Sequence, residues 1–346
     1  MKPPCSPPHE TGAAQASRRR GTGFVRPLAS SPLRGKARSA SGGAALLMAM
    51  LTVTLVATFA AAAMWQQWRA VEVEAAERGR VQSAWILVGA LDFSRLILRE
   101  DARSGGPDHL AEPWAVPLQE SRLSTFLAAE NNVSQVDDAS TDTTEAFLSG
   151  QITDMQGRLN LTNLAAGGQV DETALRQFTR LFEQLGLPQQ ELGLLVEGLR
   201  QAGGKDSAAP LMPPTVSQLG WLGLSPATVA ALAPHVTLLP ERTLVNANTA
   251  STEVLLAAID DLDMAGAQKI VQARESRHFR KADDVKTLLG GSIDCACSVQ
   301  SSYFEVRGRL RIGETMVDER SLVRRVGVEV TTLWRERGAF DREPTP

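Results

Sequence analysis

The sequence predicts an α+β fold in which a long N-terminal membrane helix packs on an antiparallel sheet and a large all-α domain is inserted between the strands. Three observations predict it. An uncharged apolar run lies near the N-terminus, segments of helical periodicity fill the middle of the chain, and alternating segments lie on both sides of them. Strands before and after a helical block indicate an insertion. The 346 residues also exceed what one hydrophobic core usually organises.

The first 43 residues form a basic leader with eight Lys or Arg residues and one acid, Glu10. The leader carries a net charge of +7, so the other 303 residues carry −10. Its Pro, Ser and Gly content, without apolar periodicity, predicts a disordered segment. The acidic remainder argues against a protein that coats nucleic acid, because such a protein needs a large basic excess.

Residues 44–64 form an apolar run of 21 residues without a charge or a proline. At roughly 1.5 Å per residue, a helix of this length covers the ~30 Å hydrocarbon core of a bilayer, so we expect one membrane span. The basic leader precedes the span and acidic residues follow it, which predicts a cytoplasmic N-terminus and an exported remainder. The alternatives are a cleaved secretory signal, a twin-arginine signal that uses residues 18–20, and a plain single-pass anchor.

A glycine ends the basic leader, and Gly43 is followed directly by the apolar helix that begins at Ala44. This junction resembles the cleavage site of type IV prepilins. The resemblance implies that a prepilin peptidase cuts between the two residues on the cytoplasmic side and that the helix is retained. Gly35 and Gly42 are other candidates, but only Gly43 adjoins the apolar run.

The fifth position of the helix that would remain after cleavage is Met48. Most members of the prepilin class have a glutamate there, which neutralises the amine of a neighbouring subunit. A buried charge is tolerated only when it is paired, so a methionine indicates a subunit that does not need this pairing. In this respect the chain resembles the K-type minor pseudopilin of type II secretion systems. The alternative is that Met48 is one more lipid-facing residue of an ordinary anchor.

Helix-compatible sequence continues from residue 65 to about residue 101, and a Ser-Gly-Gly-Pro stretch at 104–107 predicts its end. Within the predicted helix, the transmembrane part occupies 44–64 and the exported part 65–102. The predicted first part of the sheet domain, the inserted helical domain and the closing strands follow at 103–168, 169–298 and 299–340.

Residues 152–164 read ITDMQGRLNLTNL, in which Gly157 offers a turn and two leucines alternate with polar residues as on a half-buried strand. We interpret Asn160 and Asn163 as turn and cap donors, with Asn163 placed to cap the next segment of the chain. The Gly-Arg-x-Asn-Leu-x-Asn-Leu pattern, with Arg158 in its second place, closely resembles the K-type pseudopilins.

Residues 171–200 show helical spacing with a break at 186–188, and residues 203–214 are a flexible connector. A polar loop at 128–145 contains four acids within residues 137–145, but they lack the glycine-turn spacing of a recognised calcium loop, which favours a solvated linker. K-type pseudopilins usually have an acidic turn near the connector, and this chain has only Asp206 there. Calcium is therefore implied by the resemblance alone, and we expect no other cofactor.

Residues 242–289 resemble the helix-hairpin-helix units of DNA-uptake and repair proteins. Such units hold a phosphate on backbone N–H groups of a Gly-x-Gly hairpin, but here three aspartates and one glycine occupy 260–266. Seven basic residues face seven acids, so the segment has no electrostatic footprint for DNA. K-type pseudopilins contain such a module as a structural or protein-interaction element. In that interpretation Asn246, Asn248 and Thr249 cap a helix.

Alternating segments after residue 300 predict antiparallel strands that end near Trp334 and pack on the exported half of the long helix. Cys295 and Cys297 form a Cys-x-Cys pair in an oxidising compartment, which favours a disulfide over free thiols. Metal binding is a further alternative, but the nearest histidine, His278, is seventeen residues away. Motifs of hydrolases, metalloproteases, P-loop and dinucleotide enzymes do not occur, so we expect no catalytic residue and no enzyme.

The chain is identified as a member of the K-type minor pseudopilin family over nearly all of residues 43–338. The resemblance implies a tip subunit of the bacterial inner membrane with a periplasmic C-terminal domain. Its expected partners are the I-type and J-type minor pseudopilins, other pseudopilins, the assembly platform and the prepilin peptidase. Its expected role is to start or cap a short pseudopilus for export of folded proteins. A membrane-anchored DNA-uptake protein and a plain anchor stay open as alternatives.

Overall fold

The computed structural model describes residues 42–125, 146–204, 211–291, 293, 295–313 and 315–338. The chain divides into two compact units, Met1–Ala70 and Val71–Pro346. Most of the basic leader, the predicted polar loop at 128–145 and the centre of the predicted connector lie outside the described residues.

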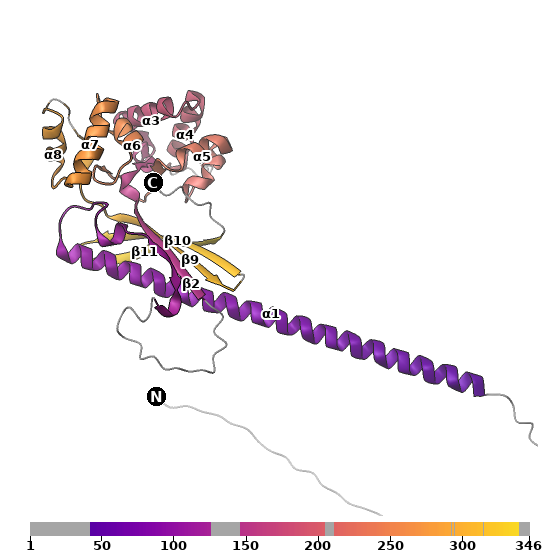
Figure 1. Ribbon diagram of the computed structural model, residues 1–346. Helices are drawn as coiled ribbons and strands as arrows, with labels where there is room; N and C mark the ends of the chain where they lie inside the picture. The colour runs from indigo at the N-terminus through magenta and orange to yellow at the C-terminus, as the bar shows by residue number, and fades with distance from the viewer. Residues whose placement is uncertain are drawn as a thin grey trace, which may run out of the picture. The chain divides into compact units, whose positions relative to one another are not determined.

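Helix α1 runs from Gly42 to Ser104 and is the long helix of Figure 1. In the first unit every side chain described along residues 43–70 is exposed. The apolar part reaches a mean hydropathy of 2.2 and is long enough to cross a membrane. Its polar groups are satisfied internally, because the hydroxyls of Thr52, Thr54 and Thr58 each donate to a carbonyl three residues earlier. The helix is therefore compatible with an apolar surrounding along residues 44–64.

In the second unit α1 packs on the sheet through Leu87, Leu91 and Leu98, which are at most 5% exposed. Gly308 permits the close approach, because a Cβ at this position would lie 3.2 Å from Leu87 Cδ2. The helix ends at Ser104, as predicted, and Gly105 and Gly106 follow with positive φ values of 68° and 126°.

The sheet has five antiparallel strands in the order β1-β2-β9-β10-β11. Two strands precede the helical block and three follow it, so β2 pairs with β9 across the insertion. The predicted α+β fold is therefore confirmed. The strand bounds are β1 Leu118–Arg122, β2 Ala146–Asp154, β9 Tyr303–Ile312, β10 Thr315–Val326 and β11 Glu329–Gly338.

Helices separate β2 from β9 and share one hydrophobic core, which includes Phe178, Leu195, Leu255 and Ile270 (Figure 1). The predicted break near residue 187 lies between α3 and α4. The bounds are α3 Glu172–Gln184, α4 Gln189–Ala202, η4 Val216–Leu222, α5 Pro226–Leu232, α6 Thr252–Ala258, α7 Met264–Ser276 and α8 Ala282–Leu288.

Short elements join the sheet to the helical block, and here the prediction of a half-buried strand at 152–164 is wrong beyond β2. The chain forms only a two-residue strand there, between two 3-10 turns. Leu159, Asn160 and Leu161 are all at most 1% exposed, because protein covers both sides of this segment. The bounds are η1 Pro113–Ala115, η2 Met155–Gly157, β3 Leu159–Asn160, η3 Leu161–Asn163, β4 Ala165–Ala166, β5 Gln169–Val170, β6 Val236–Thr237, β7 Val245–Asn246 and β8 Cys297–Ser298.

Candidate functional site

A buried polar junction connects the sheet to the helical block, and its centre is Asp154 at the end of β2. One carboxylate oxygen accepts hydrogen bonds from Ser301 Oγ at 2.6 Å, Thr249 Oγ1 at 2.6 Å and Asn246 Nδ2 at 3.0 Å. Complete burial nevertheless raises the pKa of Asp154 above its ordinary value, because these donors replace water only in part. The junction thus joins three segments that are far apart in the chain.

The predicted cap role of Asn246, Asn248 and Thr249 is wrong. Ser251 is the N-cap of α6 and accepts from Val254 N at 3.3 Å. Asn248 instead exchanges two hydrogen bonds with the backbone of Phe279, at 2.9 and 3.0 Å. Asn246 and Asn248 are 0% and 1% exposed. Their side-chain amides therefore form hydrogen bonds with buried polar groups of neighbouring loops, which would otherwise be unpaired.

The Gly157–Asn163 segment reaches the same junction from the other side. A Cβ on Gly157 would lie 2.9 Å from Thr249 Oγ1, so only glycine permits this approach. Asn160 is the N-cap of η3, where its Oδ1 accepts from Thr162 N at 3.1 Å, and its Nδ2 donates to Glu241 O at 2.7 Å. The two predicted motifs therefore contact each other directly.

Asn163 does not cap the next helix, because Asp171 is the N-cap of α3 and accepts from Ala174 N at 2.9 Å. Asn163 pairs instead with the backbone of Thr243, donating at 2.8 Å and accepting at 3.1 Å. Arg158 Nη1 donates to Ala233 O at 3.1 Å. This motif therefore holds the chain segment between α5 and α6.

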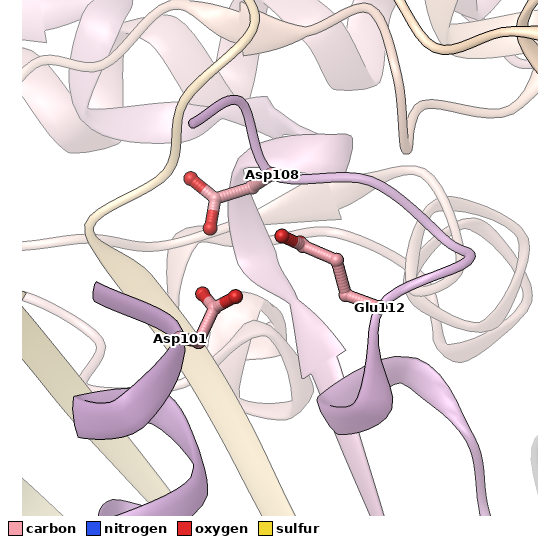
Figure 2. Close-up of side chains that lie close together, drawn as sticks. All are labelled: Asp101, Asp108 and Glu112. Carbon is pink, nitrogen blue, oxygen red and sulfur yellow. The ribbon is translucent and has the colours of Figure 1, made fainter. Parts of the chain in front are cut away.

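Three carboxylates at the end of α1 form a cluster that sequence analysis missed. Asp101, Asp108 and Glu112 point toward one another in Figure 2, and their oxygens lie within 4.8 Å of one another. The guanidinium of Arg325 donates to both aspartates. Because Arg325 lies 217 residues from Asp108, no local pattern could have indicated the pair.

The third carboxylate of this cluster, Glu112, is held by two N–H donors. Glu112 accepts from Trp114 Nε1 at 2.7 Å and from His109 N at 2.9 Å. Burial, together with the neighbouring Asp101 carboxyl, raises the pKa of Glu112 to about 7. The single guanidinium of Arg325 contacts the aspartates, so it does not offset the charge of Glu112 directly.

Calcium requires about six to eight oxygen ligands. Among the described residues, the Asp101–Asp108–Glu112 cluster is the group of acids close enough to hold a cation. Arg325 already forms ion pairs with two of these carboxylates, and N–H donors occupy the third. The donor set therefore does not fit a resident calcium ion, and we derive no metal-dependent step.

The α6–α7 hairpin is closed by its own carboxylates. Asp263 is the N-cap of α7 and accepts from Gly266 N at 2.7 Å. Asp260 pairs with Arg180 of α3 at 2.6 Å. A helix-hairpin-helix unit would present N–H groups to a phosphate at this helix N-terminus, but an aspartate occupies that position here. The hairpin geometry therefore gives no support to DNA binding.

The predicted cysteine pair and the predicted tryptophan lie near the C-terminal end of the described chain. Cys295 and Cys297 form a disulfide with a Cα–Cα distance of 5.1 Å, next to the parallel pairing of β7 with β8. Trp334 of β11 lies opposite Leu322 and packs against the small core of Met155, Leu239 and Tyr303. The tryptophan therefore supports the sheet face beside the helical block.

The predicted processing residues belong to the first unit. Gly43 and Ala44 lie in the first turn of α1, and nothing is within 4 Å of a Cβ placed on Gly43. Met48 is 68% exposed, as are its apolar neighbours to a similar degree. This part of α1 offers an uncharged surface along which a bilayer or another apolar helix can pack.

A membrane-competent helix, an antiparallel sheet on its second half and an inserted helical block together define a pilin-like subunit. Two family models described as Type II secretion system, protein K match residues 157–241 and 245–307. The chain is therefore similar to the protein K family over these two ranges.

Curated proteins named Type II secretion system protein K resemble the chain over most of its length. The Pseudomonas aeruginosa protein is 29% identical, covering 80% of this chain and 86% of its own. The Aeromonas hydrophila protein is 24% identical, covering 79% and 90%. In fold, the chain is similar to one in the crystal structure of the GspK-GspI-GspJ complex of enterotoxigenic Escherichia coli. That similarity has a TM-score of 0.55 at 20% identity, and it covers 77% of this chain and 99% of the other.

Proposed function

We propose that this chain is a minor pseudopilin at the tip of the type II secretion pseudopilus. There it starts or caps assembly with the I-type and J-type minor pseudopilins, and the assembly serves the export of folded proteins across the outer membrane. The observation that carries the proposal is the uncharged, exposed run of α1 at residues 44–64, which has Met48 at its fifth position. The similarity to a chain of the GspK-GspI-GspJ complex supports the choice of partners.

Processing in this proposal occurs between Gly43 and Ala44. A prepilin peptidase removes the basic leader on the cytoplasmic side of the inner membrane, and the new N-terminal residue is then methylated. The helix stays in the membrane, and the sheet and helical block face the periplasm. The leader carries +7 and the rest of the chain −10, which agrees with this orientation.

Assembly in this proposal uses the lack of a charge at Met48. A subunit with a glutamate at the fifth position would bury a carboxylate unless a neighbour's amine paired with it. The first or last subunit of a filament lacks a neighbour on one side. A methionine removes this pairing requirement, and the bulk of the inserted helical block leaves little room for a subunit beyond it.

The junction gives the helical block its mechanical role in this proposal, which requires no catalytic step. Asp154, Asn246 and Thr249 join the block to the sheet, and Arg325 joins the sheet to the end of α1. Force on the block is therefore transmitted to the helix through buried charged and polar contacts. The protein acts as a structural part of the secretion machine.

Two measurements test the proposed function in cells that contain a prepilin peptidase and the I-type and J-type proteins. We expect N-terminal sequencing of the membrane form to begin at Ala44, and the G43V variant to retain the leader. We also expect the processed chain to co-purify with both partners. An intact leader in the wild-type chain, or absence of both partners, would contradict the proposal.

The alternative DNA-uptake function has a separate test. The full chain would have to bind duplex DNA at low salt, with an affinity that falls steeply as salt rises. Because Asp263 occupies the N-terminus of α7, we expect no binding at low salt.

A further inference from the structure

Two tryptophans stand at the point where the apolar run of α1 ends. Trp65 and Trp68 follow directly after residues 44–64, and their ring centroids are 5.4 Å apart. The side chains are 60% and 57% exposed, although tryptophan is costly to leave in water. The next residue is Arg69. An exposed aromatic pair at this position needs a partner that is partly apolar and partly polar.

The helix places these three side chains on one face, because residues three and four apart are neighbours on a helix. Gln66 and Gln67 lie at the same height on the other side. The two indoles therefore lie on one side of the helix. They lie next to the last turn of the apolar run, before the charged segment that follows.

We propose that Trp65 and Trp68 form an interfacial anchor, whose partner is the phospholipid headgroup layer on the exported side of the inner membrane. The inference rests on the proposed function, in which residues 44–64 span the bilayer. Those 21 residues cover about 30 Å at 1.5 Å per residue, so Trp65 reaches the far boundary when Ala44 lies at the near one. Indole rings favour this boundary, where the ring contacts acyl chains and the N–H donates to polar groups.

Arg69 completes the anchor on the same face, because its stem can lie along the apolar region while its guanidinium contacts lipid phosphates. The anchor fixes two quantities. The two indoles set the depth of α1 in the bilayer, and their position on one side sets which face of the helix meets lipid. The opposite face, with Gln66 and Gln67, is left for contacts with other subunits.

Depth-dependent fluorescence quenching tests the anchor in the full chain reconstituted into phosphatidylethanolamine and phosphatidylglycerol vesicles. Lipids brominated near the headgroup and lipids brominated near the chain ends serve as the two quenchers. The signal of Trp65 and Trp68 is the difference between the wild-type chain and W65F/W68F. We expect headgroup-proximal bromines to quench this signal at least twofold more than deep bromines. The matched control Q66A/Q67A should keep the wild-type pattern.

Cysteine accessibility gives an independent measure of depth. Single cysteines placed along residues 60–73 are treated with a membrane-impermeant maleimide in a Cys5→Ser background. We expect the boundary of labelling to lie near residue 65 in the parent chain. In W65A/W68A the boundary should shift or spread by about one helical turn, roughly 5.4 Å.

The outcomes separate the anchor from the span. If carbonate releases the full chain from membranes, the membrane span of the proposed function fails. If the chain resists carbonate but deep bromines quench best, the tryptophans lie in the acyl region and the anchor is refuted. If neither quencher affects them, the pair is covered by protein and the anchor is again refuted. An unchanged labelling boundary in W65A/W68A also refutes it.

Discussion

The first part of α1 and the junction around Asp154 differ in how polarity is matched to burial. Along residues 43–70 every described side chain is exposed, and most of those up to residue 64 are apolar. At the junction, Asp154, Asn246 and Asn248 are polar and at most 5% exposed. The first region is stable only if another medium or subunit covers it, whereas the second is satisfied by its own chain. The contrast shows which part of the molecule depends on its surroundings.

The largest expected effect comes from removing the only cation that contacts Asp101 and Asp108 among the described contacts. R325A leaves two largely buried carboxylates without their ion-pair partner, which typically costs about 3–5 kcal/mol. Urea unfolding of the full chain in detergent measures the loss. The matched control is R324A, whose side chain is 39% exposed and pairs with an exposed glutamate. Equal losses of unfolding free energy in R325A and R324A would show that the buried ion pairs stabilise the fold no more than the exposed one.

A charge placed in the exposed apolar region tests whether lipid is its medium. Val53 and Val73 are 67% and 62% exposed, but only Val53 lies within residues 44–64. V53R should lower membrane insertion by about 2.5–3.5 kcal/mol, and V73R should have little effect. Carbonate extraction of membranes compares the two variants. Similar extraction would mean that the apolar run does not lie in the bilayer.

The close approach of the two motifs at the junction can be broken by one methyl group. G157A places a Cβ 2.9 Å from Thr249 Oγ1 and 3.2 Å from Thr249 O, so the backbone must move. We expect a loss of about 1–3 kcal/mol from overpacking, measured by urea unfolding. At Gly193 of α4 nothing lies within 4 Å, so G193A should be neutral or stabilising by up to about 1 kcal/mol. A neutral G157A would show that the junction tolerates separation.

The smallest expected effect is the pH dependence of stability. Glu112 has a pKa of about 7 against an ordinary value of 4.5, so the folded chain holds this proton more tightly than the unfolded chain. Its contribution to stability is complete below pH 4.5 and is lost as pH rises through about 7. The slope for one proton is at most about 1.4 kcal/mol per pH unit.

The variant E112Q should flatten the pH dependence in part, as measured by unfolding midpoints between pH 5 and pH 8. Asp108 and Asp154 also have pKa values raised by burial, so a slope of the same sign should remain. An unchanged slope in E112Q would exclude Glu112 as a contributor.

Local patterns were sufficient to predict the long apolar helix, the end of α1, the break between α3 and α4 and the closing strands. Each depends on a run of neighbouring residues, such as the uncharged stretch that includes Met48 or the glycines after Ser104. The α+β fold followed because strands on both sides of a helical block have few ways to pair.

Long-range contacts could not be predicted in the same way. Asn246 resembles a helix cap in the sequence, yet it donates to Asp154, 92 residues away, and to Ser301, 55 residues away. The Asp108–Arg325 pair is separated by 217 residues. An asparagine before a helix has the same local sequence whether it caps that helix or bonds to a distant residue. Only the packing of the helical block on the sheet decides which partner it meets.

The contact between α1 and the last strand affects the order in which the parts of the chain can fold. Arg95 of α1 donates to Val330 O of β11 at 2.7 and 3.0 Å. Strand β2 pairs with β9, which follows the whole insertion in the chain. The helical block lies within one continuous stretch of the chain, so it can form while later residues are still being synthesised. The sheet cannot close until the three C-terminal strands are available. A chain interrupted before β9 would therefore present a folded helical block beside an unfinished sheet.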